Sequence, residues 1–373
     1  MKRTRGRVVN VESLADFDRR LAAGATSMRG WRVRRLDLTE RSAALATSRL
    51  GGATFLGCSF ASGDAERVEA SGGLVLPDIT DSPVDVYRSR LYTADELYDD
   101  PDYQHSLDAR AYAWSQRSPG HEEALAQSLH DHAIDGALGE WAGERRLVGV
   151  MGGHSVQRGE AAYADAARLG HALGHHHVVA TGGGPGAMEA ANLGGSLSRR
   201  PLAELEEALT ALAAVPSYRP SVGAWARVAL DVCSRFPERA DSLGIPTWHY
   251  GHEPPNVFAT VIAKYFGNPT REAILLEVCD AGIVFLPGTG GTVQEVFQDA
   301  CENYYADESS VAPMVLVGEV YWTETLPAWP LLQSLARGRA MEGNVHLADT
   351  LEEAAALVGP AIDREVSRPA AGS

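Results

Sequence analysis

Lysine is scarce in this chain of 373 residues, since it occurs only at positions 2 and 264 and arginine supplies the other basic side chains. An enzyme that forms a Schiff base with pyridoxal phosphate needs a lysine beside a phosphate site. We expect Lys264 to lie within a helical run, residues 259–266, and not on a loop at the end of a strand. The scarcity of lysine therefore argues against pyridoxal chemistry.

Long apolar runs, paired cysteines and positive charge are scarce as well. No stretch of about eighteen apolar residues occurs, and polar residues follow the basic N-terminus, so we expect neither a membrane span nor a secretory signal. The four cysteines are scattered and form no Cys-x-x-Cys pair, which is typical of core thiols in a reducing cytoplasm. The formal net charge of −16 disfavours binding to a nucleic-acid polymer. We therefore expect a cytoplasmic protein that recognises small molecules.

The alternation of strand-like and helical segments predicts an α/β protein with two domains. We expect a small N-terminal α/β domain at 1–103, a helical connector at 104–144, a doubly wound, Rossmann-like parallel sheet at 145–360 and a flexible tail at 361–373. The strands expected in the larger domain cover residues 147–151, 178–180, 246–249, 282–286, 313–317 and 345–347. Helices are expected at 257–266 and 270–279, and no internal repeat is evident.

Three glycine-rich loops follow expected strands of the larger domain. They are Gly152-Gly153-His154-Ser155, Gly182-Gly183-Gly184-Pro185-Gly186 and Gly288-Thr289-Gly290-Gly291-Thr292. Glycine allows close backbone approach at the carboxyl edge of a parallel sheet, and each following helix offers unpaired N–H groups. Three such loops predict a site for a nucleotide or another anion. No acidic residue ends a strand about twenty residues after the second loop, and no Gly-Lys-Ser/Thr occurs, so dinucleotide and Walker A sites are disfavoured.

The segment Pro287-Gly-Thr-Gly-Gly-Thr-Val-Gln-Glu295 resembles the P-G-G-x-G-T-x-x-E signature of the Lonely Guy (LOG) family, phosphoribohydrolases that release cytokinin bases from their riboside monophosphates. Asn268-Pro-Thr-Arg271 is similar to the arginine-bearing segment that precedes that signature, and residues 148–155 with 162–170 resemble the family's opening strand, turn and helix. Gly182 to Glu189 and Glu253 to Asn256 look closer to the longer bacterial nucleotide 5′-monophosphate nucleosidases. The resemblance covers roughly residues 145–350.

The resemblance implies an enzyme that hydrolyses a nucleoside 5′-monophosphate to a free base and ribose 5-phosphate. It places Arg271 and Glu295 in the catalytic positions, and Gly183, Gly184, Gly186, Gly288, Gly290, Gly291 and Thr292 in the phosphate and ribose loops. Further expected substrate contacts are Gly152, Gly153, Ser155, Met188, Asn256 and Thr289. Thr289 and Glu272 depart from the family pattern, which has glycine and usually lysine there. We expect no cofactor and no metal.

The chemistry of N-glycosidic cleavage suits both catalytic candidates. Breaking the C1′–N bond builds positive charge on the ribose in an oxocarbenium-like transition state. A carboxylate such as Glu295 can stabilise that charge and can position or deprotonate the attacking water. A guanidinium such as Arg271 can hold a phosphate or the leaving-group region.

Structural alternatives exist for several of these residues. Thr292-Val-Gln-Glu295 also matches a helix capping box, in which the glutamate only satisfies a backbone N–H. Arg271 could be a solvent-exposed helix residue. Met188 could be a packing residue under the glycine loop, and Asn256 could cap a helix.

Two further alternatives concern metals and function. His249 with His252, and the run His175 to His177, are weak candidates for a metal site, because suitably spaced carboxylates or cysteines are lacking apart from Glu253. The main alternative function is nucleotide sensing without turnover. We also expect a homo-oligomer, a dimer.

Overall fold

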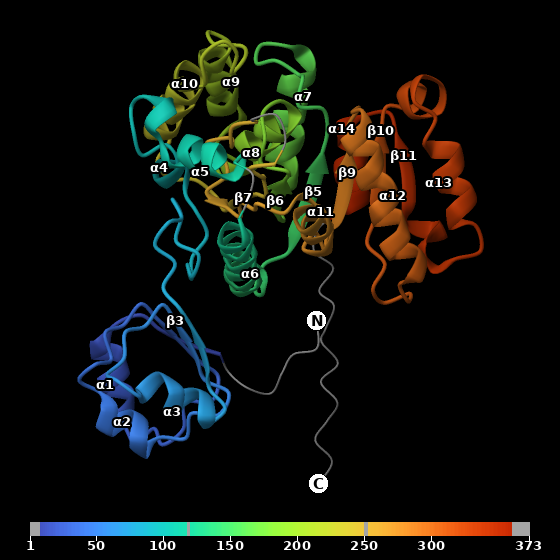
Figure 1. The fold of residues 1–373 in the computed structure, drawn as a ribbon. Coiled ribbons are helices and arrows are strands. Elements are labelled where there is room, and N and C mark those ends of the chain that lie inside the picture. The colour runs from blue at the N-terminus through green and yellow to red at the C-terminus, as the bar shows by residue number, and fades with distance from the viewer. Residues whose placement is uncertain (1–7, 118–119, 250–252, 360–373) are drawn as a thin grey trace. The chain divides into compact units, whose positions relative to one another are not determined.

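The computed structural model describes residues 8–117, 120–249 and 253–359 (Figure 1). Its contacts divide the chain into a smaller unit, residues 1–89 with 120–133, and a larger unit, residues 90–119 with 134–373. Each unit has a parallel sheet of its own. No helix in the described ranges is both long enough and apolar enough to cross a membrane. The tail expected at 361–373 lies outside the described residues.

The smaller unit is a short repeat of parallel strands and helices. Its elements are β1 (Val9–Val11), α1 (Leu14–Ala22), β2 (Trp31–Arg34), α2 (Ser42–Thr47), β3 (Thr54–Leu56), α3 (Asp64–Ala70) and β4 (Leu74–Leu76). The strands pair in the order of the sequence, with residue 9 opposite 31, 32 opposite 54 and 54 opposite 74, so successive turns span 22, 22 and 20 residues. The expectation that the chain has no internal repeat is therefore wrong. The turns share their length, their apolar positions and one left-handed glycine each, at positions 30, 52 and 72, but few other residue identities.

One apolar core joins the strands and helices of the smaller unit. The strands contribute Val11, Val33 and Phe55, and the helices contribute Phe17, Leu45 and Val68, all at most 1% exposed. Because residues of all three helices meet in this single core, the helices cover one face of the sheet. This packing accounts for a stable α/β unit before residue 90.

The larger unit is built on a seven-stranded parallel sheet with the order β11-β10-β9-β5-β6-β7-β8. Its strands are β5 (Leu147–Met151), β6 (Val178–Thr181), β7 (Ser242–Gly244), β8 (Val261–Ile262), β9 (Gly282–Phe285), β10 (Met314–Val317) and β11 (Val345–Ala348). Its α-helices are α4 (Ala94–Leu97), α5 (Leu107–Ser115), α7 (Ala161–Leu173), α8 (Ala187–Ser196), α9 (Leu202–Leu212), α10 (Val222–Arg235), α11 (Asn268–Glu277), α12 (Gly290–Tyr305), α13 (Trp329–Ala336) and α14 (Leu351–Val358). Shorter turns are η1 (Tyr103–His105), η2 (Tyr321–Thr325) and η3 (Ala340–Asn344), and helix α6 (His121–Ala142) contributes residues to both units.

The strand order has a reversal at β5. The chain proceeds outward from β5 through β6, β7 and β8, and then returns to the other side of β5 with β9, β10 and β11. Helix α7 packs on α8 and α14, while α12 packs on α11 and α13, which gives two helical layers. The predicted fold class, a doubly wound α/β sheet with a smaller N-terminal α/β unit, is confirmed. The carboxyl ends of β5 and β9 form the switch point at which such sheets bind ligands.

Two expected elements between residues 246 and 266 were wrong. The strand expected at 246–249 lies earlier, at β7, and Thr247 forms only an isolated bridge to Tyr265. The helix expected at 257–266 is absent, and this segment contains β8 instead. The segment is buried almost throughout, so its apolar residues carry no periodicity that separates helix from strand. The β-branched Val261 and Ile262 favour the strand.

A buried ion pair holds residues 90–117 in the larger unit. Asp108 on α5 is fully buried and pairs with Lys264, whose side chain is 1% exposed. The Asp108 carboxylate also accepts hydrogen bonds from Trp248 Nε1 and from the Tyr103 hydroxyl, both at 2.7 Å. Burial lowers the pKa of Lys264, and Asp108 opposes that shift. These bonds explain why residues expected in the small domain and the connector pack against the larger sheet instead.

We expect Asp108→Ala to lower the free energy of unfolding by about 3–5 kcal/mol, because it leaves the Lys264 ammonium buried without a counter-charge. Urea denaturation of the full chain measures this loss. The double variant Asp108→Ala/Lys264→Met should recover only part of it, since no unpaired buried charge remains but the Trp248 and Tyr103 donors still lack their acceptor. Asp165→Ala, which removes an exposed carboxylate, is the matched control and should change stability little. An Asp108→Ala protein as stable as wild type would contradict this account.

Candidate functional site

The three glycine-rich loops converge at the carboxyl edge of the seven-stranded sheet. They follow β5, β6 and β9 and border a cavity of about 420 Å³, which we call the carboxyl-edge cavity. Its predicted lining residues are Gly152, Gly153, Gly184, Met188, Arg271, Thr289, Gly291, Thr292 and Glu295. Its other lining residues are His154, Gly182, Pro246, Thr247, Glu253, Asn268, Glu272 and Gln294. The cavity therefore brings both predicted catalytic side chains together with residues of all three loops.

Backbone hydrogen bonds hold the loops against one another. The Gly153 N–H donates to the Pro287 carbonyl at 3.3 Å, and the Ala187 N–H donates to the Gly153 carbonyl at 3.1 Å. Gly186 has a φ of +77°, and a Cβ at this position would lie 2.7 Å from the His154 carbonyl carbon. Only glycine fits where these two loops cross. The loops are thus pre-organised by their own backbone.

Arg271 is fixed by the backbone on the opposite side of the cavity. It lies in the first turn of α11, its side chain is 13% exposed, and its Nε donates to the Ile245 carbonyl at 2.6 Å. Its Nη2 donates to the Gly182 carbonyl at 3.2 Å, while Nη1 lies 3.6 Å from Glu295 Oε1. The interpretation of Arg271 as a solvent-exposed helix residue is therefore wrong. Two carbonyls at strand ends orient its guanidinium toward Glu295.

Glu295 is a largely buried carboxyl with a perturbed proton affinity. It lies on α12, and its side chain is 13% exposed. Burial raises the pKa of Glu295 to about 7, the Arg271 guanidinium opposes this rise, and the Glu272 carboxylate adds to it. A group that titrates near neutral pH is suited to accept a proton from water or to donate one. Shifts of this kind are typical of functional carboxyls.

The capping-box interpretation of Glu295 is wrong. Helix α12 begins at Gly290, and its N-cap is Thr289, whose side chain makes no capping hydrogen bond. Thr292 therefore lies inside the first turn, and Glu295 lies one turn further along, beyond the N–H groups that a capping box satisfies. The glutamate faces Arg271 instead.

The two departures from the family pattern both lie at the cavity. Glu272 accepts a hydrogen bond from Asn268 Nδ2 at 2.7 Å, and its second oxygen accepts one from Gln294 Nε2. Thr289 is exposed at the N-cap of α12. Glu272 is thus held in place as a second carboxylate near Glu295, where the family pattern would supply a cation.

His154 and Glu253 are lining residues that sequence reasoning did not assign to the site. His154 Nδ1 lies 3.5 Å from Glu253 Oε1, and both side chains are partly exposed. His154 stands within the first glycine loop, so its position at the sheet edge was a usable signal. Glu253 lies within residues 246–266, for which the expected elements were wrong. The sequence therefore did not reveal that Glu253 lies close to the first glycine loop.

Several predicted contacts lie outside the carboxyl-edge cavity. Asn256 is fully buried, its Nδ2 donates to the Gly184 carbonyl at 3.2 Å, and its Oδ1 accepts from the N–H groups of Phe258 and Ala259 at 3.1 Å. Asn256 therefore supports the second glycine loop from behind and does not line the cavity. Gly183 and Gly288 are buried, and Gly290 is exposed as the first residue of α12.

Ser155 and Gly186 line a second hollow next to the first. This adjoining cavity of about 300 Å³ is lined by His154, Ser155, Val156, Gln157, Pro185, Gly186, Glu189, Pro216, Ser217, Tyr218, Arg219 and Trp225. His154 lines both cavities. The first glycine loop therefore separates a space beside Glu295 from a space beside aromatic side chains.

Metal binding receives no support from the part of the chain that the structure describes. Within it, no three His, Cys, Asp or Glu side chains are grouped to hold a metal ion. His252, one member of the weighed histidine pair, lies outside the described residues.

No protein-family model matches the chain, and no curated protein matches its sequence. The molybdenum cofactor binding protein of the phototrophic bacterium Rippkaea orientalis is a similar solved structure, at 18% identity over 57% of this chain and 93% of that chain, with a TM-score of 0.34. Two structures of the molybdenum cofactor carrier protein of Chlamydomonas reinhardtii are also 18% identical, over 58% of this chain and 96% of theirs, with TM-scores of 0.34 and 0.35. These likenesses are distant. The chain's own strand order and helical layers define it as an α/β protein with a Rossmann-like unit.

We expect Glu295→Gln to change how stability depends on pH. The pKa of Glu295 is about 7 in the folded chain, above the ordinary value of 4.5, so folding takes up a proton between these values. In wild type, this bound proton contributes to the free energy of unfolding fully below pH 4.5, and the contribution is lost as pH rises through 7. Glutamine does not titrate, so the variant has no such loss. From pH 5 to pH 8, the variant should gain about 2 kcal/mol of unfolding free energy relative to wild type. Urea denaturation at four pH values measures this difference, and parallel profiles would contradict the burial of an ionising Glu295.

Proposed function

We propose that this protein hydrolyses the N-glycosidic bond of a nucleoside 5′-monophosphate to a free base and ribose 5-phosphate. The observation that carries the proposal is the largely buried Arg271–Glu295 pair, 3.6 Å apart, in a cavity bordered by three glycine-rich loops. The same residues carry the resemblance to the LOG phosphoribohydrolases and to the bacterial nucleotide 5′-monophosphate nucleosidases.

The substrate phosphate binds at the N-terminus of α12 in this proposal. The first N–H groups of a helix have no intrahelical acceptor, and the helix dipole favours an anion there. Gly291 and Thr292 belong to this first turn and line the carboxyl-edge cavity. Glu295 lies one turn further along the same helix. A phosphate at Gly291 and Thr292 would place the ribose toward Glu295.

Glu295 performs the chemical step by proton transfer and charge stabilisation. The C1′–N bond breaks, its electron pair leaves with the base, and positive charge develops on the ribose. The Glu295 carboxylate stabilises that charge and takes a proton from water, whose oxygen bonds to C1′. The base nitrogen gains a proton from solvent and Glu295 later returns its own to solvent, so one water is consumed overall. A low-dielectric surrounding strengthens these interactions relative to bulk water.

Arg271 orients Glu295 in this mechanism. Its Nε and Nη2 donate to backbone carbonyls, which leaves Nη1 directed at the glutamate. The positive charge lowers the pKa of Glu295 against the effect of burial. A larger fraction of the carboxyl is therefore ionised at neutral pH than burial alone would allow.

The base extends toward the adjoining cavity in this proposal. His154 lines both cavities, and the accessible side chains of Tyr218 and Arg219 line the adjoining one, in which Trp225 is buried under the Arg158 guanidinium. Aromatic and guanidinium groups stack favourably on planar bases. The protein would thus separate phosphate anchoring at α12 from base contacts beyond the first glycine loop.

Nucleotide sensing without turnover is the second candidate function. Glu272, held by Asn268 and Gln294, adds a carboxylate where the resembling family usually has lysine. The Glu272 carboxylate raises the pKa of Glu295, so less of the catalytic carboxylate is ionised at neutral pH, as would be expected in a protein that has lost its activity. Turnover separates the two candidates directly.

Incubation with AMP, GMP, CMP and UMP, each beside its nucleoside, tests the proposal. We expect at least one monophosphate to yield free base and ribose 5-phosphate, measured by chromatography. The nucleoside should be cleaved at least about a hundredfold less efficiently, since it lacks the anchoring energy of the phosphate. Protein carrying Glu295→Gln, purified identically, controls for contaminating enzymes. Nucleotide binding without base release would establish the sensor, and equal rates on nucleoside and nucleotide would contradict the phosphate's role.

A further inference from the structure

The opposite edge of the seven-stranded sheet holds a larger cavity, of about 660 Å³. We call it the amino-edge cavity, because Arg146, Asp280 and Ala312 lie just before β5, β9 and β10. Its remaining lining residues are Leu276, Glu277, Cys279, Asp299, Glu302, Asn303, Ala306, Ser309, Ser310 and Val311. It shares no lining residue with the carboxyl-edge cavity. The proposed hydrolysis assigns no role to any of these side chains.

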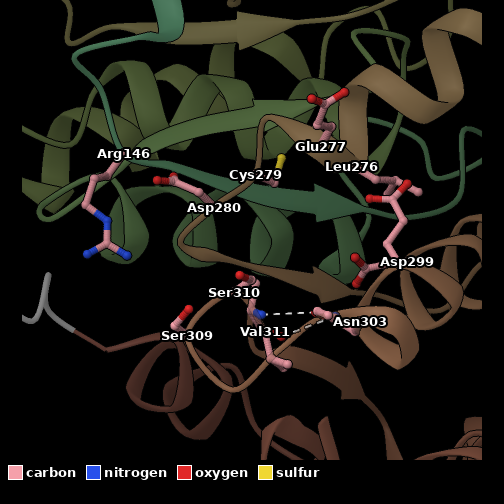
Figure 2. Close-up of a pocket in the computed structure, with 13 residues that line it drawn as sticks. Arg146, Leu276, Glu277, Cys279, Asp280, Asp299, Asn303, Ser309, Ser310 and Val311 are labelled. Atoms are coloured by element: carbon pink, nitrogen blue, oxygen red, sulfur yellow. Dashed lines mark hydrogen bonds between the residues drawn. The ribbon is translucent and has the colours of Figure 1, made fainter. Parts of the chain in front are cut away.

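The side chains of the amino-edge cavity carry excess negative charge. Four carboxyl groups, those of Glu277, Asp280, Asp299 and Glu302, line the cavity together with one guanidinium, that of Arg146. Figure 2 shows Arg146 and Asp280 on one side of the cavity and Asp299 on the other. Asn303 Nδ2 donates to the Ala312 carbonyl at 3.3 Å, and Asn303 Oδ1 accepts from the Ala312 N–H at 3.1 Å. These two hydrogen bonds hold the cavity wall formed by residues 309–312.

The helices add to this negative potential. Helix α11 ends at Glu277 and α12 ends at Tyr305, so both present their carboxyl ends near this edge. The carboxyl end of a helix carries partial negative charge, which cations stabilise. Neither helix has a basic residue in its last turn. The cavity is therefore electrostatically matched to a positively charged ligand.

Asp299 supplies an independent indication of a missing partner. Asp299 is 6% exposed, and its Oδ2 atom is buried without a hydrogen-bond partner. Buried polar atoms without partners are rare in folded proteins, because each loses its hydration without compensation. Burial and the nearby Glu302 raise the pKa of Asp299 to about 8, so the side chain holds a proton at neutral pH when no cation is bound. A rotation of the Asp299 side chain would bring this atom into the cavity, where an ammonium group would satisfy it.

We propose that the amino-edge cavity binds an aliphatic di- or polyamine, with one ammonium group at Asp299 and another at the carboxylates of Glu277 or Asp280. The proposal does not depend on the hydrolytic function.

The dimensions and chemistry of the cavity favour an organic cation over a metal ion. Within the described residues, no three carboxyl, thiol or imidazole groups are grouped closely enough to hold a metal. The acidic groups are instead spread around a space much larger than one ion. Leu276, Ala306 and Val311 add apolar lining between them, which suits the methylene segments of an alkyl amine.

Isothermal titration calorimetry of the full chain with spermidine tests this site. We expect one saturable site in wild type, with close to one proton released per spermidine at pH 7 when heats are compared in two buffers, since binding ionises Asp299. Arg146, Glu277, Cys279, Asp280 and Glu302 are the other titratable groups around Asp299, and Asp299→Asn should abolish the proton release. This variant should also weaken binding at least about tenfold.

Two further variants keep the test decisive if Asp299→Asn folds poorly. Glu302→Gln removes an exposed carboxylate of the cavity and should weaken binding several-fold, whereas Glu324→Gln removes an exposed carboxylate outside it and should not. Equal loss in both variants would mean that spermidine only responds to the net charge of −16. That outcome, an absence of saturable binding, or displacement of spermidine by equimolar Mg²⁺ would overturn the proposal.

Discussion

The partial burial of Glu295 beside Arg271 is the constraint on which the chemistry proposed for the carboxyl-edge cavity depends. A buried carboxylate without a partner would cost several kcal/mol, and the group would then remain protonated. Arg271 offsets part of that cost from 3.6 Å, and the pKa of Glu295 consequently lies at about 7, near neutral pH. Arg271 can do so because the backbone carbonyls of Ile245 and Gly182 hold its guanidinium. The protonation of one side chain thus depends on the ends of two strands.

The polarity of the doubly wound sheet explains why its two edges suit ligands of opposite charge. Helices that connect parallel strands run back against them, so helix N-termini gather at the carboxyl edge of the sheet and helix C-termini at the amino edge. Helix α12 has its first turn at the carboxyl-edge cavity and Asp299 and Glu302 at the amino-edge cavity. One helix therefore contributes to a site proposed for a phosphate and to a site proposed for an amine.

Local patterns predicted the parts of the site that depend on short stretches of chain. The glycine-rich loops follow predicted strands, so the sequence alone places them at one edge of the sheet. Arg271 and Glu295 were selected through the resemblance to the LOG signature, and the structure brings them to the same cavity as the loops. The role of Asn256 could not be predicted, because its partners, among them Gly184, come from another loop. A single sequence gave no sign of the bond between Asp108 and Lys264, which lie 156 positions apart.

The same distinction applies to the fold. Strands with strong apolar runs, such as β5 and β9, were predicted nearly to the residue, and the capping pattern at Thr292 to Glu295 was misleading because it ignores where α12 begins. The repeat of the smaller unit was missed because its turns share their spacing and one glycine each, at positions 30, 52 and 72, but few other residues. Residues 257–266 were misassigned because complete burial removes the periodicity that distinguishes a helix from a strand.

The dependence of kcat/KM on pH, measured for wild type and Glu295→Gln with the best monophosphate, tests most directly whether ionised Glu295 drives the reaction. The wild-type profile should rise with an apparent pKa near 7, because only the carboxylate stabilises the ribose cation and accepts a proton. The variant should be roughly a hundred to ten thousandfold slower and should lack this rise. Any titration of the substrate phosphate affects both proteins equally, so the difference between their two profiles reports Glu295. A variant with near wild-type turnover, or the same rise in both proteins, would contradict the account.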